Sequence, residues 1–193
     1  MAARLMLRMH LEEAWRRTIA QEYAGQLINS EKGLQVFFCK HLLDCFKSDK
    51  VSRRLFIEPR VSMPGSDDPK YARHPDIVIC HTRKIIGIVE IKYLPRTRAK
   101  FKKDLLTLDW LLEGQVDVAL SNDRYRGPRA VHKGYSLAGD AVYCWAGVHC
   151  EPETKVALPD ARAINDRVFV LHAITSREAV PIVRVAGNTG LSE

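Results

Sequence analysis

The stretch that decides the fold is HPDIVICHTRKIIGIVEIKY, residues 74–93. It contains two apolar runs, Ile77–Cys80 and Ile85–Tyr93, which are rich in β-branched residues and are separated by four polar residues. Short runs of this composition are typical of buried β-strands, and a connection of this length is typical of a hairpin. The sequence therefore predicts two adjacent strands, around which the rest of the chain is organised.

Three charged residues lie in these apolar strands, where an isolated charge is costly. Asp76 begins the first run, and Glu90 and Lys92 interrupt the second. Because side chains alternate along a strand, Glu90 and Lys92 project from one face, and a hairpin places Asp76 near the end that carries Glu90. The sequence therefore predicts two carboxylates and an ammonium at one place. This is either a metal site with a catalytic cation or a buried ion network.

The elements around the hairpin indicate an α/β chain. Apolar residues at helical spacing predict helices at 10–27 and 31–46, and a third at 101–112 that ends before Gly114. A strand is expected at 53–63, where Pro59 indicates an edge position or a bulge. Further strands are expected at 116–120, 142–148, 167–174 and 178–186, and a basic loop insertion at about 121–140.

Composition narrows the class of protein. The 193 residues are enough for one domain with a sizeable core, so we expect a single domain over 1–193 with its core at about 10–175. No apolar run approaches the ~20 residues of a membrane span. The N-terminus is interpreted as part of the first helix, so we expect a cytoplasmic protein without membrane contact. Five cysteines without a Cys-x-x-Cys pair favour buried, reduced thiols.

The formal charge of +7 favours a polyanionic partner, nucleic acid first, because phosphate neutralisation supplies most non-specific affinity. Basic residues cluster after the hairpin, at the start of a helix whose dipole they oppose, and this favours phosphate contact. They recur in the loop insertion, interleaved with tyrosine. A solvated face and a disordered insertion are the alternatives. The expected nucleic-acid contacts are Arg73, Arg96, Arg98, Lys100, Lys103, Arg124, Arg126, Arg129 and Lys133.

Glu31 begins the second expected helix and offers a further carboxylate. An acid in a first turn complements the helix dipole, which is one interpretation. The other is that Glu31 points into the same cleft as Asp76 and Glu90 and binds a metal ion there. Glu22 is a less favoured candidate for the same role.

The charged residues of the hairpin suit phosphodiester hydrolysis. Mg²⁺ and Mn²⁺ prefer oxygen ligands, and one or two carboxylates commonly hold them while water and substrate phosphate complete the shell. Asp76 and Glu90 supply the carboxylates, and the main-chain carbonyl of Ile91 adds a neutral oxygen. A bound ion lowers the pKa of a water, and Lys92 orients that water, helps to deprotonate it, or offsets developing negative charge.

Pro75-Asp76 followed by Glu90-Ile91-Lys92 resembles the motif of the PD-(D/E)xK nuclease superfamily, which includes restriction endonucleases, repair nucleases and junction resolvases. The motif covers about twenty residues, and the order of elements extends the likeness to roughly residues 10–120. The resemblance implies a restriction endonuclease-like core, a mixed central β-sheet flanked by helices (αβββαβ). It also implies Mg²⁺ dependence, with Mn²⁺ as a substitute. Asp76 and Glu90 are the implied metal ligands, Lys92 the catalytic lysine, and Glu31 the acid from the first core helix.

We therefore expect a metal-dependent nuclease, with DNA favoured over RNA and endonucleolytic cutting favoured. A homodimer or a place in a larger complex is expected. Two alternatives remain open. One is a non-cleaving nucleic-acid-binding subunit on the same scaffold, and the other is a structural protein whose Asp76, Glu90 and Lys92 form a buried network.

Overall fold

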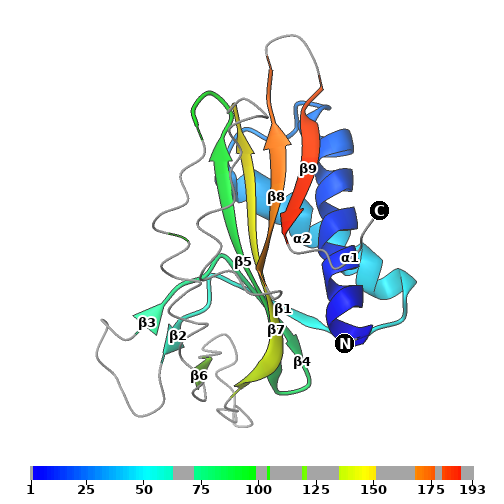
Figure 1. Cartoon of the computed structure of the whole chain (residues 1–193), viewed down its shortest axis with the longest axis vertical. Coiled ribbons are helices and arrows are strands. Elements are labelled where there is room, and N and C mark those ends of the chain that lie inside the picture. Colours follow the sequence, from blue (N-terminus) through cyan, green and yellow to red (C-terminus); the bar gives the residue numbers. More distant parts are fainter. Residues whose placement is uncertain are drawn as a thin grey trace.

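The structure, a computed structural model, describes residues 2–62, 72–98, 104, 119–120, 135–150, 168–176 and 180–187. Its centre is a six-stranded sheet (Figure 1). In spatial order the strands are β1 (Arg54–Ile57), β4 (Ile77–His81), β5 (Lys84–Leu94), β7 (Ser136–His149), β8 (Val168–Ile174) and β9 (Ile182–Gly187). The β5–β7 and β7–β8 pairs are parallel and the others antiparallel, so the sheet is mixed.

The predicted hairpin is confirmed. Strands β4 and β5 pair antiparallel, with Ile77 opposite Val89 and His81 opposite Lys84, and a bulge interrupts the ladder between Ile79 and Cys80. The turn between the strands places Thr82 in the left-handed region, at φ 55°. Extending the register by one residue brings Asp76 opposite Glu90.

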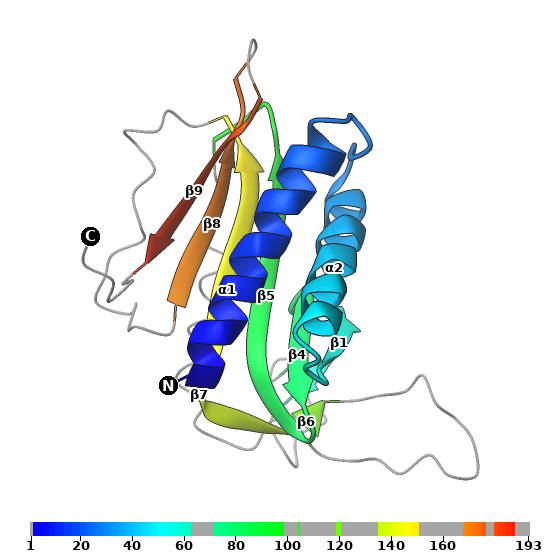
Figure 2. The same ribbon diagram turned by 90° about the vertical axis from the view of Figure 1, so that its right-hand side faces the viewer.

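Two helices cover one face of the sheet (Figure 2). Helix α1 (Ala2–Arg17) continues into the π-helix η1 (Thr18–Tyr23), and α2 (Glu31–Ser48) is capped by Ser30, whose hydroxyl accepts the Gly33 N–H at 3.1 Å. The N-terminus belongs to the first helix, as interpreted from the sequence, and buried Leu7 extends its apolar stripe by one turn. The helix expected to reach residue 27 is regular only to Arg17 and continues as η1 to Tyr23. None of the described helices is long and apolar enough to cross a bilayer.

The core lies on both faces of the sheet. Val89 and Ile91 of β5 pack against the helices, whereas Ile88 belongs to a second cluster on the opposite face. Since side chains alternate along β5, Glu90 and Lys92 lie on the face opposite the helices. The predicted alternation in this strand is thus confirmed, and it separates the charged side chains from the larger apolar core.

Two strand predictions need correction. The expected strand 53–63 is divided into β1 and β2 (Val61–Ser62), because Pro59 has no N–H and Glu58 adopts φ 47°. Strand β1 is an edge strand, as Pro59 indicated.

The expected loop insertion 121–140 is wrong for residues 136–140, which belong to β7. Buried Tyr135 and Ala138 anchor this end of the strand in the second cluster.

A second, three-stranded sheet has the order β3-β2-β6 and lies to the left of the lower part of the main sheet in Figure 1. It consists of β2, β3 (Ala72–Arg73) and β6 (Ala119–Leu120), the last being the described end of the strand expected at 116–120. Of the helix expected at 101–112, the structure describes Asp104, which is helical. The part of the loop insertion at 121–134 lies outside the described residues.

Candidate active site

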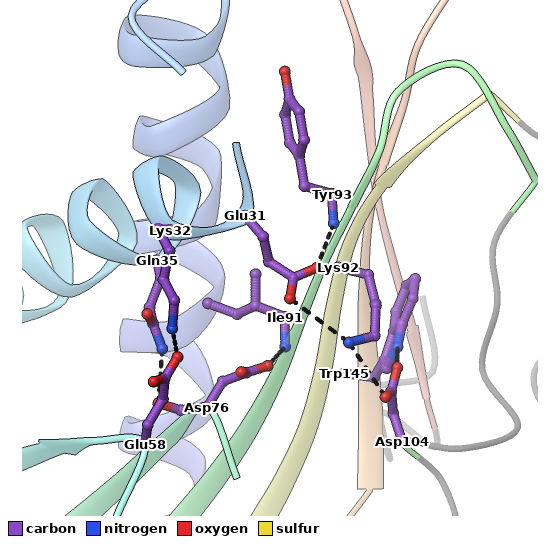
Figure 3. Close-up of polar contacts among 10 residues, drawn as sticks. All are labelled: Glu31, Lys32, Gln35, Glu58, Asp76, Ile91, Lys92, Tyr93, Asp104 and Trp145. Atoms are coloured by element: carbon purple, nitrogen blue, oxygen red, sulfur yellow. Dashed lines mark hydrogen bonds and ion pairs between the residues drawn. The ribbon is translucent and has the colours of Figure 1, made fainter. Parts of the chain in front are cut away.

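The charged residues of the hairpin meet where β4 ends and β5 continues. Strand β4 begins at Ile77, opposite Val89, whereas β5 runs on to Leu94. The edge of β5 beyond Val89 therefore has no β4 partner, and backbone groups there need other partners. Two carboxylates supply them (Figure 3). Asp76 Oδ2 accepts the Ile91 N–H at 2.6 Å, and Glu31 Oε2 accepts the Tyr93 N–H at 3.2 Å.

The side chain of Lys92 reaches these carboxylates from the face of the sheet opposite the helices. Its ammonium lies 3.8 Å from Glu31 Oε1 and 3.3 Å from Asp104 Oδ1. The other oxygen of Asp104 accepts a hydrogen bond from the indole N–H of buried Trp145 at 3.1 Å. Asp104 is 4% exposed and Trp145 is fully buried, so the carboxylate that faces Lys92 is held in one place.

Glu90 is buried beside Asp76, at 6% exposure. Burial raises the pKa of Glu90 to about 9, with the negative charges of Asp76 and Asp104 acting in the same direction and Lys92 opposing them. Burial also raises the pKa of Asp76, against the Ile91 N–H and the Lys92 charge. Without a further cation, Glu90 is therefore protonated at neutral pH, and a hydrogen bond links the two carboxyl groups.

Lys92 remains an ammonium ion at neutral pH. Burial acts to lower its pKa, but the charges of Asp104, Glu31 and Asp76 outweigh burial and raise it above the ordinary value. A lysine in this state cannot take a proton from water. Of the roles expected for Lys92, orienting water and offsetting negative charge are the ones that fit.

The backbone of Asp76 is fixed from two sides (Figure 3). Its carbonyl oxygen accepts the side-chain amide of Gln35 at 2.8 Å and the N–H of Glu58 at 2.9 Å. Gln35 lies one turn after Glu31 in α2, so one end of this helix positions both acids. Lys32, in the same turn, forms an ion pair with Glu58.

The structure thus brings Asp76, Glu90 and Lys92 together, as the hairpin predicted, and places Glu31 beside them, which agrees with the second of its two interpretations. Their roles in metal binding and catalysis stay predictions. The carbonyl of Ile91 points to the same side of β5 as its N–H, which is the side of Asp76. Glu22 lies elsewhere. Its buried carboxylate binds Lys40 at 2.9 Å and His41 at 3.1 Å, so the second candidate for the metal role has other partners.

The predicted nucleic-acid contacts are described in part. Arg96 and Arg98 are exposed just beyond the end of β5, and half-buried Arg73 donates to the carbonyl of Ala72 at 2.9 Å. The others, Lys100, Lys103, Arg124, Arg126, Arg129 and Lys133, lie outside the described residues.

Asp104 is the site residue that sequence reasoning missed. It follows Phe101 by three residues and precedes Leu108 by four, so it shares the inward face of the expected helix with the apolar stripe. An acid on an inward face calls for a buried partner. This signal was present, but the lysines around Asp104 mask it.

The carboxylate oxygens of this site are the kind of ligand that a divalent cation such as Mg²⁺ prefers. Within the described part of the chain, no three His, Cys, Asp or Glu side chains are arranged as a ready metal cage. Mg²⁺, however, is commonly held by one or two carboxylates together with water and substrate phosphates. Asp76 and Glu90 are such a pair. Their pKa values are raised by burial and by neighbouring carboxylates, so a bound cation would stabilise their charged forms.

Comparisons with protein-family models, curated proteins and solved structures return no match for this chain. Its function is therefore inferred from its residues and their geometry.

Proposed function

We propose that this chain is a Mg²⁺-dependent nuclease that hydrolyses phosphodiester bonds, with DNA as the favoured substrate and cutting within the strand. One observation carries the proposal. Asp76 and Glu90 adjoin on neighbouring strands, and the ammonium of Lys92, from the same face as Glu90, is held beside them by Asp104 and Glu31.

Each residue has a distinct role in the proposed reaction. Asp76 and Glu90 hold the metal ion, with the carbonyl of Ile91 as a neutral oxygen. When bound, the ion supplies an acidified water and stabilises the charge on the phosphate. Lys92 remains charged, orients the attacking water and offsets the negative charge that develops on the phosphate oxygens. Asp104 and Glu31 hold the ammonium and act as positioning residues.

The fold and the charge of the chain support the same function. The mixed sheet, with a helix before it and the Asp76–Lys92 hairpin inside it, agrees with what the PD-(D/E)xK resemblance implies. The described order α2, β1, β4, β5 and β7 supports the αβββαβ pattern once α1, η1 and the short strands are set aside, and of the second helix in this pattern the structure describes Asp104. A formal charge of +7 suits a polyanionic substrate. A restriction endonuclease-like core is accordingly part of the proposal.

Incubation of the purified chain with plasmid, single-stranded DNA and RNA tests the proposal. Parallel reactions contain Mg²⁺, Mn²⁺ or EDTA. We expect divalent-dependent cleavage of DNA that Asp76→Asn abolishes, whereas Glu13→Gln, an exposed acid on α1, cuts like the parent. Absence of divalent-dependent cleavage, or an Asp76→Asn variant that cuts at the parental rate, would overturn the proposal.

A non-cleaving subunit that binds nucleic acid is the second candidate. It is favoured by the partners that Asp76 and Glu31 already have, since both accept backbone N–H groups of β5. Carboxylates satisfied in this way have a structural role even without a metal ion. DNA binding of equal affinity in Mg²⁺ and EDTA, without cleavage in either, would identify this candidate.

A further inference from the structure

A groove lies where the parallel strands β5, β7 and β8 end. It encloses about 660 Å³ and is lined by Tyr23, Pro95, Arg96, Cys150, Thr175 and Ser176. Crevices at the carboxyl ends of parallel strands are frequent ligand sites. Pockets of ~300–1,000 Å³ accommodate small ligands, so this groove has room for a nucleotide.

The floor of the groove is fixed by hydrogen bonds between the three strand ends. The Thr175 hydroxyl donates to the Pro95 carbonyl at 2.7 Å, and the Thr175 N–H donates to the His149 carbonyl at 2.8 Å. The Cys150 N–H donates to the Thr97 carbonyl at 3.0 Å. The groove is therefore preformed, and binding there requires little reorganisation.

The lining chemistry suits an anion attached to a flat, partly apolar group. Arg96 is an exposed cation, and no acid is among the described residues that line the groove. Ser176 offers a hydroxyl, and Pro95 an apolar surface. Burial and the neighbouring Tyr93 raise the pKa of Tyr23, so its phenol keeps the proton at neutral pH. Guanidinium, hydroxyl and aromatic ring together match a phosphate with its sugar or base.

Contacts through Tyr93 connect the groove to the candidate active site. The Tyr23 ring meets the Tyr93 ring edge-on, with centroids 6.3 Å apart, and the Tyr93 N–H binds Glu31. Lys92 and Arg96 are four residues apart along β5 and its continuation. Strand β5 ends at Leu94, and Arg96 lies in the turn that the Thr97 N–H closes on the Leu94 carbonyl at 3.0 Å. At no more than ~3.3 Å per residue, the Cα atoms of Lys92 and Arg96 are at most ~13 Å apart, which is within about four steps of a stacked strand at ~3.4 Å each.

We propose that this groove binds a nucleotide of the substrate strand a few positions from the bond that is cut, with Arg96 on its phosphate and Tyr23 against its base or sugar. The inference rests on the proposed nuclease function and adds the path of the strand. It assigns Tyr23 and Ser176 roles that their places in the sequence do not indicate.

Cys150 provides a direct probe of the groove. It is exposed, whereas the other four cysteines are buried, so a maleimide reagent modifies it selectively. The experiment uses the full chain carrying Asp76→Asn, so that the DNA is bound but not cut. The ligand is a 15-nucleotide single-stranded DNA. We expect DNA at about ten times its Kd to slow alkylation of Cys150 about tenfold, by mass action. Pre-modified Cys150 should weaken DNA binding, whereas Cys150→Ser treated with the reagent should not.

Arg96→Gln is the matched test of the phosphate contact. We expect weaker binding and a drop of about 1 in the slope of log affinity against log salt concentration. The control is Lys84→Gln, an exposed cation at the other end of β5, which should leave both unchanged. DNA that binds without protecting Cys150, or equal effects of the two variants, would overturn the inference.

Cleavage by the parent chain is scored separately. Cleavage without protection of Cys150 refutes the groove and leaves the proposed function standing. Protection without cleavage supports the groove as a nucleic-acid site and refutes the nuclease.

Discussion

The ammonium of Lys92 lies 3.3 Å from Asp104 Oδ1, and the other oxygen of Asp104 accepts the buried indole N–H of Trp145. A residue of β7 thus fixes, through one carboxylate, the cation that β5 presents. The position of the Lys92 ammonium therefore depends on Asp104, which connects β5 to Trp145 of β7.

The charge of Asp104 should matter more for cleavage than for folding. In Asp104→Asn the amide oxygen still accepts the Trp145 N–H, but the ammonium loses the nearer of its two carboxylate partners. We expect cleavage to fall about 10²-fold, the size of effect that a misplaced catalytic group produces. In Asp104→Ala the indole N–H also loses its acceptor, at a cost of ~1–3 kcal/mol in stability. Cleavage rates and melting curves of both variants test this, and an Asp104→Asn variant with parental activity would contradict it.

Lys92→Met distinguishes a catalytic lysine from one that only neutralises buried acids. Burial already raises the pKa of Asp76, Glu90 and Asp104, and removal of the ammonium, whose charge lowers all three values, favours their neutral forms further. We therefore expect a small change in melting temperature and a loss of cleavage of at least ~10²-fold. A large drop in melting temperature would identify a structural network, and unchanged cleavage would exclude the catalytic role.

Gly147 should be sensitive to a single added methyl group. A Cβ there would overlap the Trp145 ring, which lies over this glycine on the strand next to Lys92. Gly147→Ala should destabilise the fold by ~1–3 kcal/mol, as overpacking does, and lower cleavage by displacing the indole from Asp104. Gly139→Ala, on the same strand with open space around the added atom, is the control. Equal denaturation midpoints for the two variants would show that the indole relocates freely.

Stability without metal should depend on pH through Glu90. The native state keeps a proton that the unfolded chain releases near pH 4.5, because the native pKa is about 9. The native state therefore binds more protons in this window, and stability falls as pH rises from about 4.5 to 9. The slope contributed by one full proton is at most ~1.4 kcal/mol per pH unit. Urea unfolding in EDTA at pH 5 to 9 should show this slope in the parent, and Glu90→Gln should flatten it.

Stabilisation by Mg²⁺ should increase with pH over the same range. A metal ion at Asp76 and Glu90 competes with the proton on Glu90, so binding releases a proton and strengthens as pH rises. We expect Mg²⁺ at one fixed concentration to raise the melting temperature more at pH 8.5 than at pH 6.5. Asp76→Asn should remove the effect at both values. A shift of the same size at both values in the parent would argue against Glu90 as a ligand.

The hairpin and the meeting of its three charged residues could be predicted because the evidence for them is local. Alternation within β5 fixes the face of Glu90 and Lys92, and antiparallel pairing fixes the place of Asp76. Glu31 was expected from another element, and its capped position at the start of α2 delivers it to the edge of β5.

Partners that depend on three-dimensional proximity could not be predicted in the same way. Asp104 and Trp145 are forty-one residues apart in sequence, and their hydrogen bond depends on the parallel pairing of β5 and β7. The extension of β7 back to Ser136 was hidden by Gly139 and Asp140, which interrupt its apolar pattern but are exposed on the strand. Local periodicity does not register such tertiary effects.

The rate at which supercoiled plasmid is cut with and without Mg²⁺ tests the central claim most directly, measured side by side for the parent, Asp76→Asn and Glu13→Gln. We predict cleavage by the parent and by Glu13→Gln in Mg²⁺, none in EDTA, and none by Asp76→Asn in either. Intact plasmid in every reaction, or cleavage by Asp76→Asn at the parental rate, would contradict the assignment of a metal-dependent nuclease centre to Asp76, Glu90 and Lys92.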